Sequence, residues 1–310
     1  MLRSLSRATA LVGAALLTLT ACGGTDAAAP AASAATVSVT DAGGQVDVPR
    51  TPARVVTFDM SVLDSLDVLG VPVVGLPKQN VPEFLAKYDG AEYADVGTLF
   101  EANLEAVNAA DPDLILVAGR SSGLKEQLSR LAPTLDMTIA PERLMADFER
   151  NARTLGTIFG KEAQVEAILD DVTASVEETR GLAANADAGL IVLTSGNKVT
   201  AYGPGSRFGM IHDVLGVQPA IPNVEEATHG EAISFELVAQ ANPARMFVVD
   251  RDAATGDGAA RQVLENPLVQ GTAAWTSNRV TYLDPTRWYI ANGGLSTVPA
   301  MVDEVKTALR

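Results

Sequence analysis

The stretch Asp113-Leu114-Ile115-Leu116-Val117-Ala118, followed directly by Gly119-Arg120, indicates the fold most clearly. A continuous apolar run of this kind is typical of a strand that is covered on both faces, as in a parallel sheet. Shorter apolar runs at 54–58 and 71–75 precede it, and a helical stretch at 61–69 separates them. Short strands that alternate with helices predict an α/β fold with a mostly parallel sheet.

The segment around this strand recurs later in the chain. Residues 103–120 and 234–251 align without a gap at an offset of 131. The shared pairs are Glu105/Glu236, Val107/Val238, Ala110/Ala241, Pro112/Pro243, Val117/Val248 and Arg120/Arg251. Because ligands bind outside the carboxyl ends of strands in open α/β sheets, we expect Arg120 and Arg251 on the two walls of one cleft.

The middle of the chain has a different pattern. From about 141 to 183 there is no strand-like run, and apolar residues recur at helical spacing. We therefore predict two Rossmann-like α/β lobes, 36–143 and 186–310, each with a central, mostly parallel sheet, joined by a single long helix within 144–185. A helix bends less readily than a loop, so we expect only modest closure of the lobes.

The N-terminus is typical of an exported protein. Two arginines in the first seven residues precede an apolar run, 8–21, that is too short to span a bilayer, which needs about 20 apolar residues. Small residues lead to the one cysteine, Cys22, in a pattern that resembles a bacterial lipobox. We expect 1–21 to be a signal peptide, a lipid on Cys22 to anchor the exported protein to the cell membrane, and 22–35 to be a flexible tether. An ordinary signal peptide with a chance cysteine is the alternative.

The chain is strongly acidic. Its formal net charge is −15, and removal of the signal peptide takes away two basic residues and no acidic one, which leaves about −17. This acidity argues against nucleic acid, whose binding needs a basic face, and against adsorption to anionic lipid. An anionic ligand would need arginines gathered locally against the unfavourable overall field.

Three further motifs carry polar or aromatic residues. The turn Tyr202-Gly203-Pro204-Gly205-Ser206-Arg207-Phe208-Gly209 contains glycines that allow close approach of a ligand, and it lacks the Gly-Lys-Ser/Thr of a P-loop. A polar loop contains Thr228-His229-Gly230, and Trp288-Tyr289 follows a predicted strand. Taken alone, these motifs leave open a structural turn, a structural histidine and an aromatic pair that fills the core.

One motif points to an enzyme. Gly119-Arg120-Ser121-Ser122-Gly123 matches G-x-S-x-G between a strand and a helix, the context of a hydrolase nucleophile. However, no HGGG-type oxyanion segment precedes it, and the repeat partner at 251–254 keeps the arginine but not the serine. We therefore do not expect an enzyme, and a serine hydrolase that uses Ser121 is a remote alternative.

Together, these motifs resemble the substrate-binding lipoproteins of ABC iron importers, the class with one long helix between the lobes. Within that class the chain is most similar to the catecholate (petrobactin-type) siderophore binders. The motifs that carry the resemblance are Gly75-Leu76-Pro77-Lys78-Gln79-Asn80, Asp111-Pro112-Asp113-Leu114-Ile115, Gly119-Arg120, Ala201 to Gly209, Thr228-His229-Gly230, Asp250-Arg251 and Trp288-Tyr289.

The resemblance implies a role for each motif residue. Arg120, Arg207 and Arg251 would surround an anionic ferric–catecholate complex, since arginine stays charged and donates in a planar fork. Ferric iron prefers oxygen donors, which the siderophore supplies. If the siderophore offers only four donors, Tyr289 and His229 could fill the two remaining positions on the iron.

The resemblance also implies partners. Lys78 would reach the same cleft, and Glu105 and Glu236, one in each lobe, would pair with arginines of a membrane permease. Such a protein needs no resident cofactor, because iron arrives as part of the ligand, and we expect it to act as a monomer.

The sequence departs from the family pattern after the tyrosine, where 290–294 only loosely matches a glycine-rich stretch. This departure leaves the size of the pocket and the identity of the siderophore open. A binding protein for another iron chelate, heme or cobalamin is the alternative. It would keep the fold and the docking glutamates, but it would not need three arginines together with His229 and Tyr289.

Overall fold

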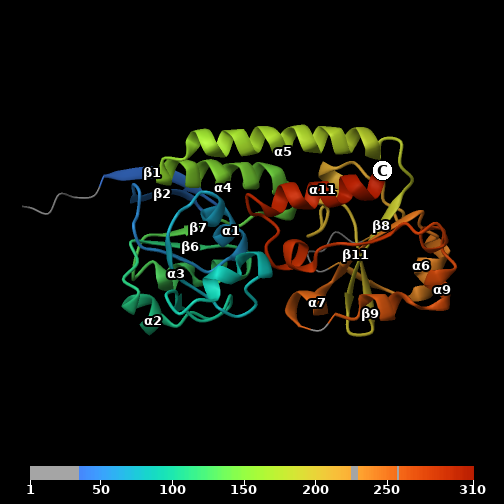
Figure 1. The fold of residues 1–310 in the computed structure, drawn as a ribbon, viewed down its shortest axis with the longest axis horizontal. Helices are drawn as coiled ribbons and strands as arrows, with labels where there is room; N and C mark the ends of the chain where they lie inside the picture. Colours follow the sequence, from blue (N-terminus) through green and yellow to red (C-terminus); the bar gives the residue numbers. More distant parts are fainter. Residues whose placement is uncertain (1–34, 225–229, 257) are drawn as a thin grey trace, which may run out of the picture. The chain divides into compact units, whose positions relative to one another are not determined.

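The structure is a computed structural model that describes residues 35–224, 230–256 and 258–310. The predicted signal peptide, Cys22 and His229 lie outside the described residues. Within them, the predicted α/β fold is confirmed, with one five-stranded sheet in each of two lobes (Figure 1). Among the described helices, none is both long and apolar enough to cross a membrane.

The strand predicted at 113–118 is β6 of the first lobe, and all its residues are buried, as expected for a strand covered on both faces. Its sheet has the order β5-β4-β3-β6-β7, and every neighbouring pair is parallel. The strands are β3 (Val55–Thr57), β4 (Val73–Leu76), β5 (Ala94–Asp95), β6 (Leu114–Val117) and β7 (Thr134–Asp136). The helices are α1 (Met60–Val68), α2 (Leu104–Ala109) and α3 (Lys125–Leu128), with 3-10 turns η1 (Glu83–Asp89), η2 (Gly119–Leu124) and η3 (Pro141–Arg143).

The second lobe contains a sheet of the order β10-β9-β8-β11-β12. Its centre, β8-β11-β12, is parallel, whereas β9 and β10 run antiparallel at one edge. The strands are β8 (Gly189–Ser195), β9 (Lys198–Tyr202), β10 (Glu231–Ile233), β11 (Arg245–Asp250) and β12 (Val280–Tyr282). The helices are α6 (Phe235–Ala241), α7 (Arg251–Thr255), α8 (Ala260–Leu264), α9 (Pro267–Gln270), α10 (Ala273–Thr276) and α11 (Thr297–Leu309), with the short turns η4 (Met210–Val214) and η5 (Thr286–Ile290).

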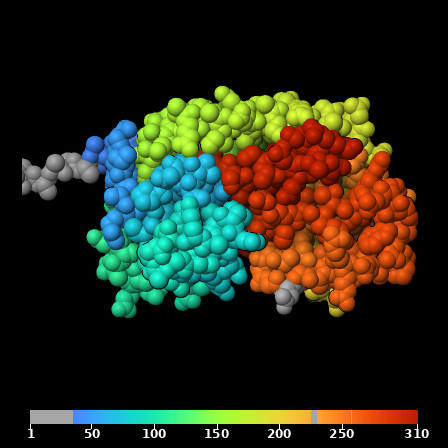
Figure 2. Space-filling view, viewed as in Figure 1, coloured from blue at the N-terminus to red at the C-terminus, as the bar shows by residue number. Residues whose placement is uncertain are grey.

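The segment expected to form the linker contains two helices, α4 (Leu144–Phe159) and α5 (Glu162–Ala183), and not one continuous helix. Gly160 ends α4 in a left-handed conformation, with φ of +65°, which a glycine adopts without strain. Of the two, α5 is the helix that runs along both lobes, and Figure 2 shows its yellow-green residues over the blue first lobe and against the red C-terminal helix.

Helix α4 belongs to the first lobe. It packs on a two-stranded antiparallel hairpin, β1 (Thr36–Asp41) and β2 (Gly44–Pro49), which the apolar pattern did not predict. The Thr154 hydroxyl on α4 donates to the carbonyl of Thr40 at 3.3 Å. The pattern missed the hairpin because its strands are largely exposed and carry few apolar residues.

A second connection between the lobes lies near the C-terminus. The Asp64 carboxylate of α1 accepts hydrogen bonds from the Ser296 and Thr297 amides at 2.8 and 3.3 Å, and the Ser65 hydroxyl accepts one from the Leu295 amide at 3.2 Å. A helix of the first lobe therefore caps α11 of the second lobe, satisfying amides that would otherwise lack partners. The lobes are joined through both α5 and this cap.

Candidate functional site

Two arginines stand where parallel strands end. Arg120 follows β6 and is the second residue of the turn η2, directly after Gly119, whose φ of +48° lies in the left-handed region. Arg251 follows β11 and begins α7, where the Asp250 carboxylate accepts hydrogen bonds from the amides of the two residues after Arg251, at 3.1 and 3.2 Å. Each lobe therefore places one arginine at the edge of its sheet where ligands bind in α/β folds.

Tyr289, in the turn after β12, is the point on which three arginines converge. The Arg120 side chain donates a 2.9 Å hydrogen bond to the main-chain carbonyl of Tyr289, and Arg207 donates to the same oxygen. The guanidinium carbons of Arg207, Arg120 and Arg251 lie 4.3, 5.1 and 5.9 Å from the centre of the tyrosine ring. We call these four residues the arginine–tyrosine cluster.

Arg207 reaches the cluster from a tightly bonded turn. The Ser206 hydroxyl donates to the Gly203 carbonyl at 2.5 Å, and the Gly205 amide donates to the Asp213 carboxylate at 2.7 Å. Because β9 is antiparallel to β8, β9 ends, and this turn begins, at the end of the sheet opposite to Arg251. The Arg207 side chain nevertheless contacts Tyr289.

Two rings flank the Arg207 guanidinium. Its carbon lies 5.6 Å from the centre of the buried Phe208 ring and 4.3 Å from that of Tyr289. The Phe208 ring packs edge-on against Tyr202, with the two centres 4.6 Å apart. Aromatic faces attract a cation, so these rings stabilise a guanidinium that has lost part of its water.

The cluster changes the acidity of its members. Burial lowers the pKa of Arg207 to about 10, and repulsion from Arg120 acts in the same direction. Burial raises the pKa of Tyr289, but attraction by Arg207, Arg251 and Arg120 outweighs it, and the pKa lies below the ordinary value of 10.0. The cluster therefore concentrates positive charge and favours an ionised oxygen among the arginines.

Sequence reasoning missed two residues beside the cluster. Asp59 follows β3 just as Arg120 follows β6, and burial raises the pKa of its carboxyl, while the Arg120 charge acts in the opposite direction. That strand-end position was the signal that could have identified it. Tyr202 ends β9, and burial raises the pKa of its phenol, although Arg207 opposes this. Nothing local in the sequence separates its role from that of a core residue.

A cavity of about 80 Å³ lies at the same end of the first sheet. It is lined by Asp59, Ser61, Val62, Ser65, Ala118, Gly119, Met137, Ile139, Asn151, Leu155, Asn292 and Gly293. Sites for whole small molecules usually measure roughly 300–1,000 Å³. The cavity is therefore too small to hold a siderophore, and the arginine–tyrosine cluster is the better candidate site.

The structure does not bring Lys78 into the cluster. Its ammonium donates to the carbonyls of Asp89 and Gly90, at 3.2 and 2.6 Å, within the first lobe. Glu105 and Glu236 are exposed and occupy the same place in α2 and α6, two positions after the capping residue. Their equal placement shows that the sequence repeat is also a structural repeat.

The structure shows the surroundings of the residues for which the sequence left a structural role open. Ser121 is fully buried, and its hydroxyl is bonded within its own turn to Ala118 at 3.0 Å, so it is not placed as a nucleophile. Trp288 fills the core and donates to the Glu304 carboxylate at 2.8 Å, whereas the adjacent Tyr289 faces the arginines. His212 is buried, and its ring bonds to the Val217 carbonyl at 2.7 Å.

Metal binding by this chain alone has no support in the described part of the chain, which contains no group of three or more His, Cys, Asp or Glu side chains that could hold a metal ion. Of the two predicted iron ligands, Tyr289 lies in the cluster and His229 lies outside the described residues.

Known proteins match almost all of the described chain. The family model described as periplasmic binding protein matches residues 55–286. The chain is 40% identical over 266 residues to the petrobactin-binding protein YclQ of Bacillus subtilis, with 84% of each chain covered. It is 32% identical over 270 residues to the ferric-anguibactin-binding protein FatB of Vibrio anguillarum, again with 84% of each covered.

Solved structures agree with these matches. The crystal structure of YclQ superposes with a TM-score of 0.86 at 37% identity, covering 89% of this chain and 99% of that one. The periplasmic catecholate-siderophore binding protein VctP of Vibrio cholerae gives a TM-score of 0.84 at 32% identity, covering 88% and 100%.

Proposed function

This chain belongs to the periplasmic binding protein family, and from that premise we propose that it captures a ferric, catecholate-type siderophore and delivers it to the permease of an ABC importer. The observation that carries the proposal is the convergence of Arg120, Arg207 and Arg251 on Tyr289, with arginines from both lobes. The names of the relatives agree, since YclQ is a petrobactin-binding protein and VctP a catecholate-siderophore binding protein.

The chemistry of the cluster suits such a ligand. A ferric catecholate is a compact anion with aromatic rings, and guanidinium groups both pair with anionic oxygen and stack on aromatic faces. Three like charges in one place are unfavourable without a partner; burial is the main cause of the lowered pKa of Arg207, and repulsion from Arg120 adds to it. An anionic ligand removes that repulsion, which gives the binding energy a clear electrostatic source.

Tyr289 has a conditional role in the proposal. Its lowered pKa favours the phenolate, which is a hard oxygen donor of the kind that ferric iron prefers. A siderophore with six donors leaves no position on the iron, whereas one with four donors leaves two, for Tyr289 and His229. Lys78 remains a weaker candidate, because it bonds to main-chain carbonyls away from the cluster.

Delivery rests on the surfaces around Glu105 and Glu236. Large exposed apolar side chains accompany both glutamates: Phe100 and Leu104 precede Glu105, and Leu268 lies on α9, beside α6. Exposed apolar and acidic groups together are typical of an interaction surface. We infer that the two glutamates contact arginines on two equivalent halves of a permease.

The cellular context also remains a proposal from the sequence. We infer that the chain is exported, that a lipid on Cys22 anchors it to the cell membrane, and that it acts as a monomer without a resident cofactor. The family consists of binding proteins, and the buried hydroxyl of Ser121 gives a hydrolase no support.

A panel of iron ligands tests the function. Quenching of tryptophan fluorescence, with native mass spectrometry to count bound ligands, would compare ferric catecholates, hydroxamates and citrate, together with heme and cobalamin. We expect the tightest binding for a catecholate. Preference for heme, cobalamin or ferric citrate would contradict the proposal and support the alternative ligand that binds.

A further inference from the structure

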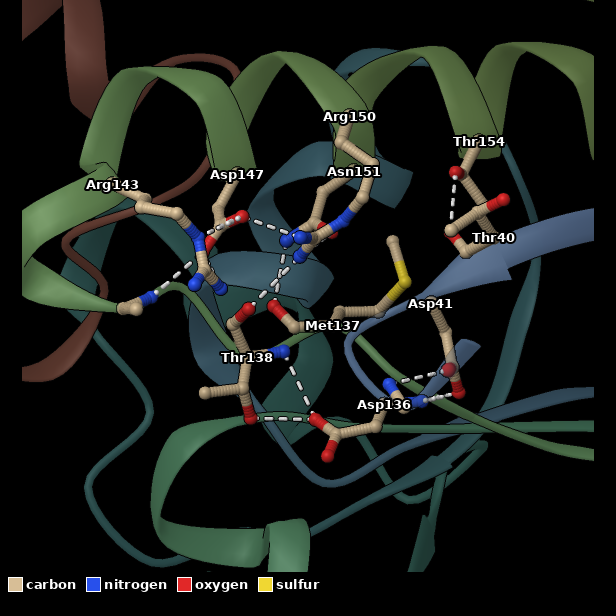
Figure 3. A network of polar contacts seen from close by, with 12 residues as sticks. Thr40, Asp41, Asp136, Met137, Thr138, Arg143, Asp147, Arg150, Asn151 and Thr154 are labelled. Atoms are coloured by element: carbon tan, nitrogen blue, oxygen red, sulfur yellow. Dashed lines mark hydrogen bonds and ion pairs between the residues drawn. The ribbon is translucent and has the colours of Figure 1, made fainter. Parts of the chain in front are cut away.

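A threonine two residues after the end of β7, Thr138, holds the turn that carries Arg120. The Gly119 amide donates to the Thr138 hydroxyl at 2.9 Å, and that hydroxyl donates to the Asp136 carboxylate at 2.5 Å (Figure 3 shows the second contact). A hydroxyl has one proton, and a carboxylate only accepts. The Thr138 O–H therefore donates its hydrogen bond to Asp136, and the hydroxyl oxygen is left to accept the hydrogen bond from the Gly119 amide.

Thr138 is itself held from several sides (Figure 3). Its carbonyl accepts from Arg150 at 3.0 Å, and its amide donates to Asp136 at 2.9 Å. The neighbouring carbonyl of Met137 accepts from the side-chain amide of Asn151 at 2.6 Å. The main-chain amide of Asp136 donates to the Asp41 carboxylate at 2.9 Å. These bonds come from helix α4 and the β1–β2 hairpin, so the hydroxyl is presented from a fixed frame.

The repeat shows why such an outside contact is needed. In the second lobe the residue before Arg251 is Asp250, whose own carboxylate accepts from the Ala253 and Ala260 amides at 3.2 and 2.8 Å. The equivalent residue in the first lobe is Gly119, which has no side chain and adopts a left-handed φ of +48°. Its amide is held from outside the turn by Thr138, while its carbonyl accepts a hydrogen bond from the Ser122 hydroxyl at 2.9 Å.

We propose that Thr138 is a positioning residue for ligand binding, which aims Arg120 at the cluster by holding the Gly119 amide. This inference rests on the proposed function of the cluster. Thr138 does not need to touch the ligand, because its effect passes through one peptide unit to Arg120. Without the bond, Gly119 can sample other conformations, and the guanidinium is no longer held for the ligand.

Binding of the iron(III) complex of 2,3-dihydroxybenzoate, followed by tryptophan fluorescence, tests the role. Loss of one hydrogen bond to a constrained amide should weaken binding about tenfold in Thr138→Val, and Thr138→Ser should restore it. Thr154→Val is the matched control, because it removes a similar hydroxyl of the same lobe whose hydrogen bond, among the described residues, goes to Thr40 and not to the turn that carries Arg120. It should bind as the unaltered protein does.

Two further measurements separate positioning from general damage. If Thr138 acts through Arg120, Thr138→Val should have no added effect on affinity in an Arg120→Ala background. In the ligand-free protein, Thr138→Val should speed hydrogen exchange of the Gly119 amide. An undiminished effect in the Arg120→Ala background, or unchanged exchange, overturns the inference. Failure of the unaltered protein to bind the chelate refutes the proposed function instead, and the exchange rate still tests the contact.

Discussion

The Arg120 guanidinium donates a 2.9 Å hydrogen bond to the main-chain carbonyl of Tyr289, 169 residues away and in the other lobe. Arg207 of the second lobe donates to the same oxygen. An anionic ligand would compete with this carbonyl for both guanidinium groups. The same two guanidinium groups would therefore bind the ligand and hold Tyr289 at the contact between the lobes. Ligand binding is in this way physically linked to the relative position of the lobes.

Arg207 should contribute most of the three arginines to binding. It is the arginine closest to the Tyr289 ring, and its guanidinium also contacts the Phe208 ring. Arg207→Ala should weaken ferric catecholate binding by about 2–5 kcal/mol, because ligand charge is left without its partner. Arg207→Lys should recover only part of this, since lysine keeps the charge but loses the planar fork.

Arg261 provides a control for this prediction. It is an exposed arginine that also stacks on a tyrosine, with its guanidinium carbon 4.3 Å from the centre of the Tyr282 ring, but it lies outside the cluster. Isothermal titration of Arg261→Ala should give the affinity of the unaltered protein. Equal affinities for the unaltered protein and the Arg120/Arg207 double alanine variant would refute the role of the arginines.

Tyr289 should ionise before the buried tyrosines of the chain. Its pKa lies below 10.0, whereas burial raises the pKa values of Tyr88, Tyr202 and Tyr282. The difference in ultraviolet absorbance between the unaltered protein and Tyr289→Phe, followed as pH rises, isolates this phenol. Arg207→Ala should raise its pKa. If Tyr289 ionised in the same pH range as the buried tyrosines, the arginines would not be lowering the pKa of its phenol.

Tyr289→Phe should distinguish siderophores by their number of donors. A chelate with six donors has no open position on iron and should bind the variant almost normally. A chelate with four donors should bind it much more weakly, and the charge-transfer absorption band, which reports phenolate on iron, should change. Weak binding without a spectral change would exclude Tyr289 as an iron ligand, but the proposed role of the arginines in ligand binding would still stand.

The two sheets could be predicted because several independent local patterns indicate each of them. The run 113–118 is β6, and the repeat at an offset of 131 places Glu105 and Glu236 at one position of two helices. By contrast, the break at Gly160 is a single signal in a periodic apolar pattern, so the sequence predicted the long helix that joins the lobes, which is α5, but not the separate helix α4 before it.

The site was predictable where a residue's role follows from its place on its own strand, and not where it depends on a distant partner. Arg120 and Arg251 could be placed because each follows a strand that the sequence reveals. The resemblance to the family, and not a local pattern, placed Arg207 and Tyr289 at one ligand. That Lys78 bonds to Asp89 instead of reaching the cleft depends on how loops cross between elements, and no local pattern indicates such contacts.

Charge reversal of the two equivalent glutamates should separate binding from delivery. Glu105→Lys and Glu236→Lys should leave siderophore affinity unchanged and lower uptake by proteoliposomes that contain the importer, because both residues are exposed and each would repel a permease arginine. Glu126→Lys, another exposed glutamate of the first lobe, is the charge control. Undiminished uptake with the double reversal would rule out docking through these residues.

The exposed apolar residues beside Glu105 allow a second test of the same surface. Phe100 is 70% exposed, and Phe100→Ser should lower uptake without lowering thermal stability, since little apolar surface is lost from the core. Leu131→Ser is the control, because Leu131 is 38% exposed on the same lobe and lies in a groove with Val46 and Asp47. A drop in siderophore affinity in Phe100→Ser would mean that Phe100 contributes to the siderophore site and not to the docking surface.

Asp64 should make the connection between the lobes depend on pH. Burial raises the pKa of its carboxyl above the ordinary value of 3.8, and the hydrogen bonds from Ser296 and Thr297 only partly offset this. Between 3.8 and the raised pKa, the folded protein binds more protons at Asp64 than the unfolded chain does. The contribution of Asp64 to the free energy of unfolding therefore falls as pH rises through this range.

Denaturant unfolding at several pH values between about 4 and 7 tests this sign, because Asp64→Asn removes the titrating group. Relative to the unaltered protein, this variant should gain stability as pH rises. Asp147→Asn should do the opposite at lower pH. Burial raises the pKa of Asp147, but the Ala140 amide, Arg143 and Arg150 together lower it by more, so the pKa lies below the ordinary value of 3.8. Its ionised form therefore stabilises the fold, and this contribution is lost as pH falls below 3.8, so the measurements on this variant extend into that range. A stability difference for Asp64→Asn that does not change with pH would mean that Asp64 keeps the same charge in both states and acts only as a cap of α11.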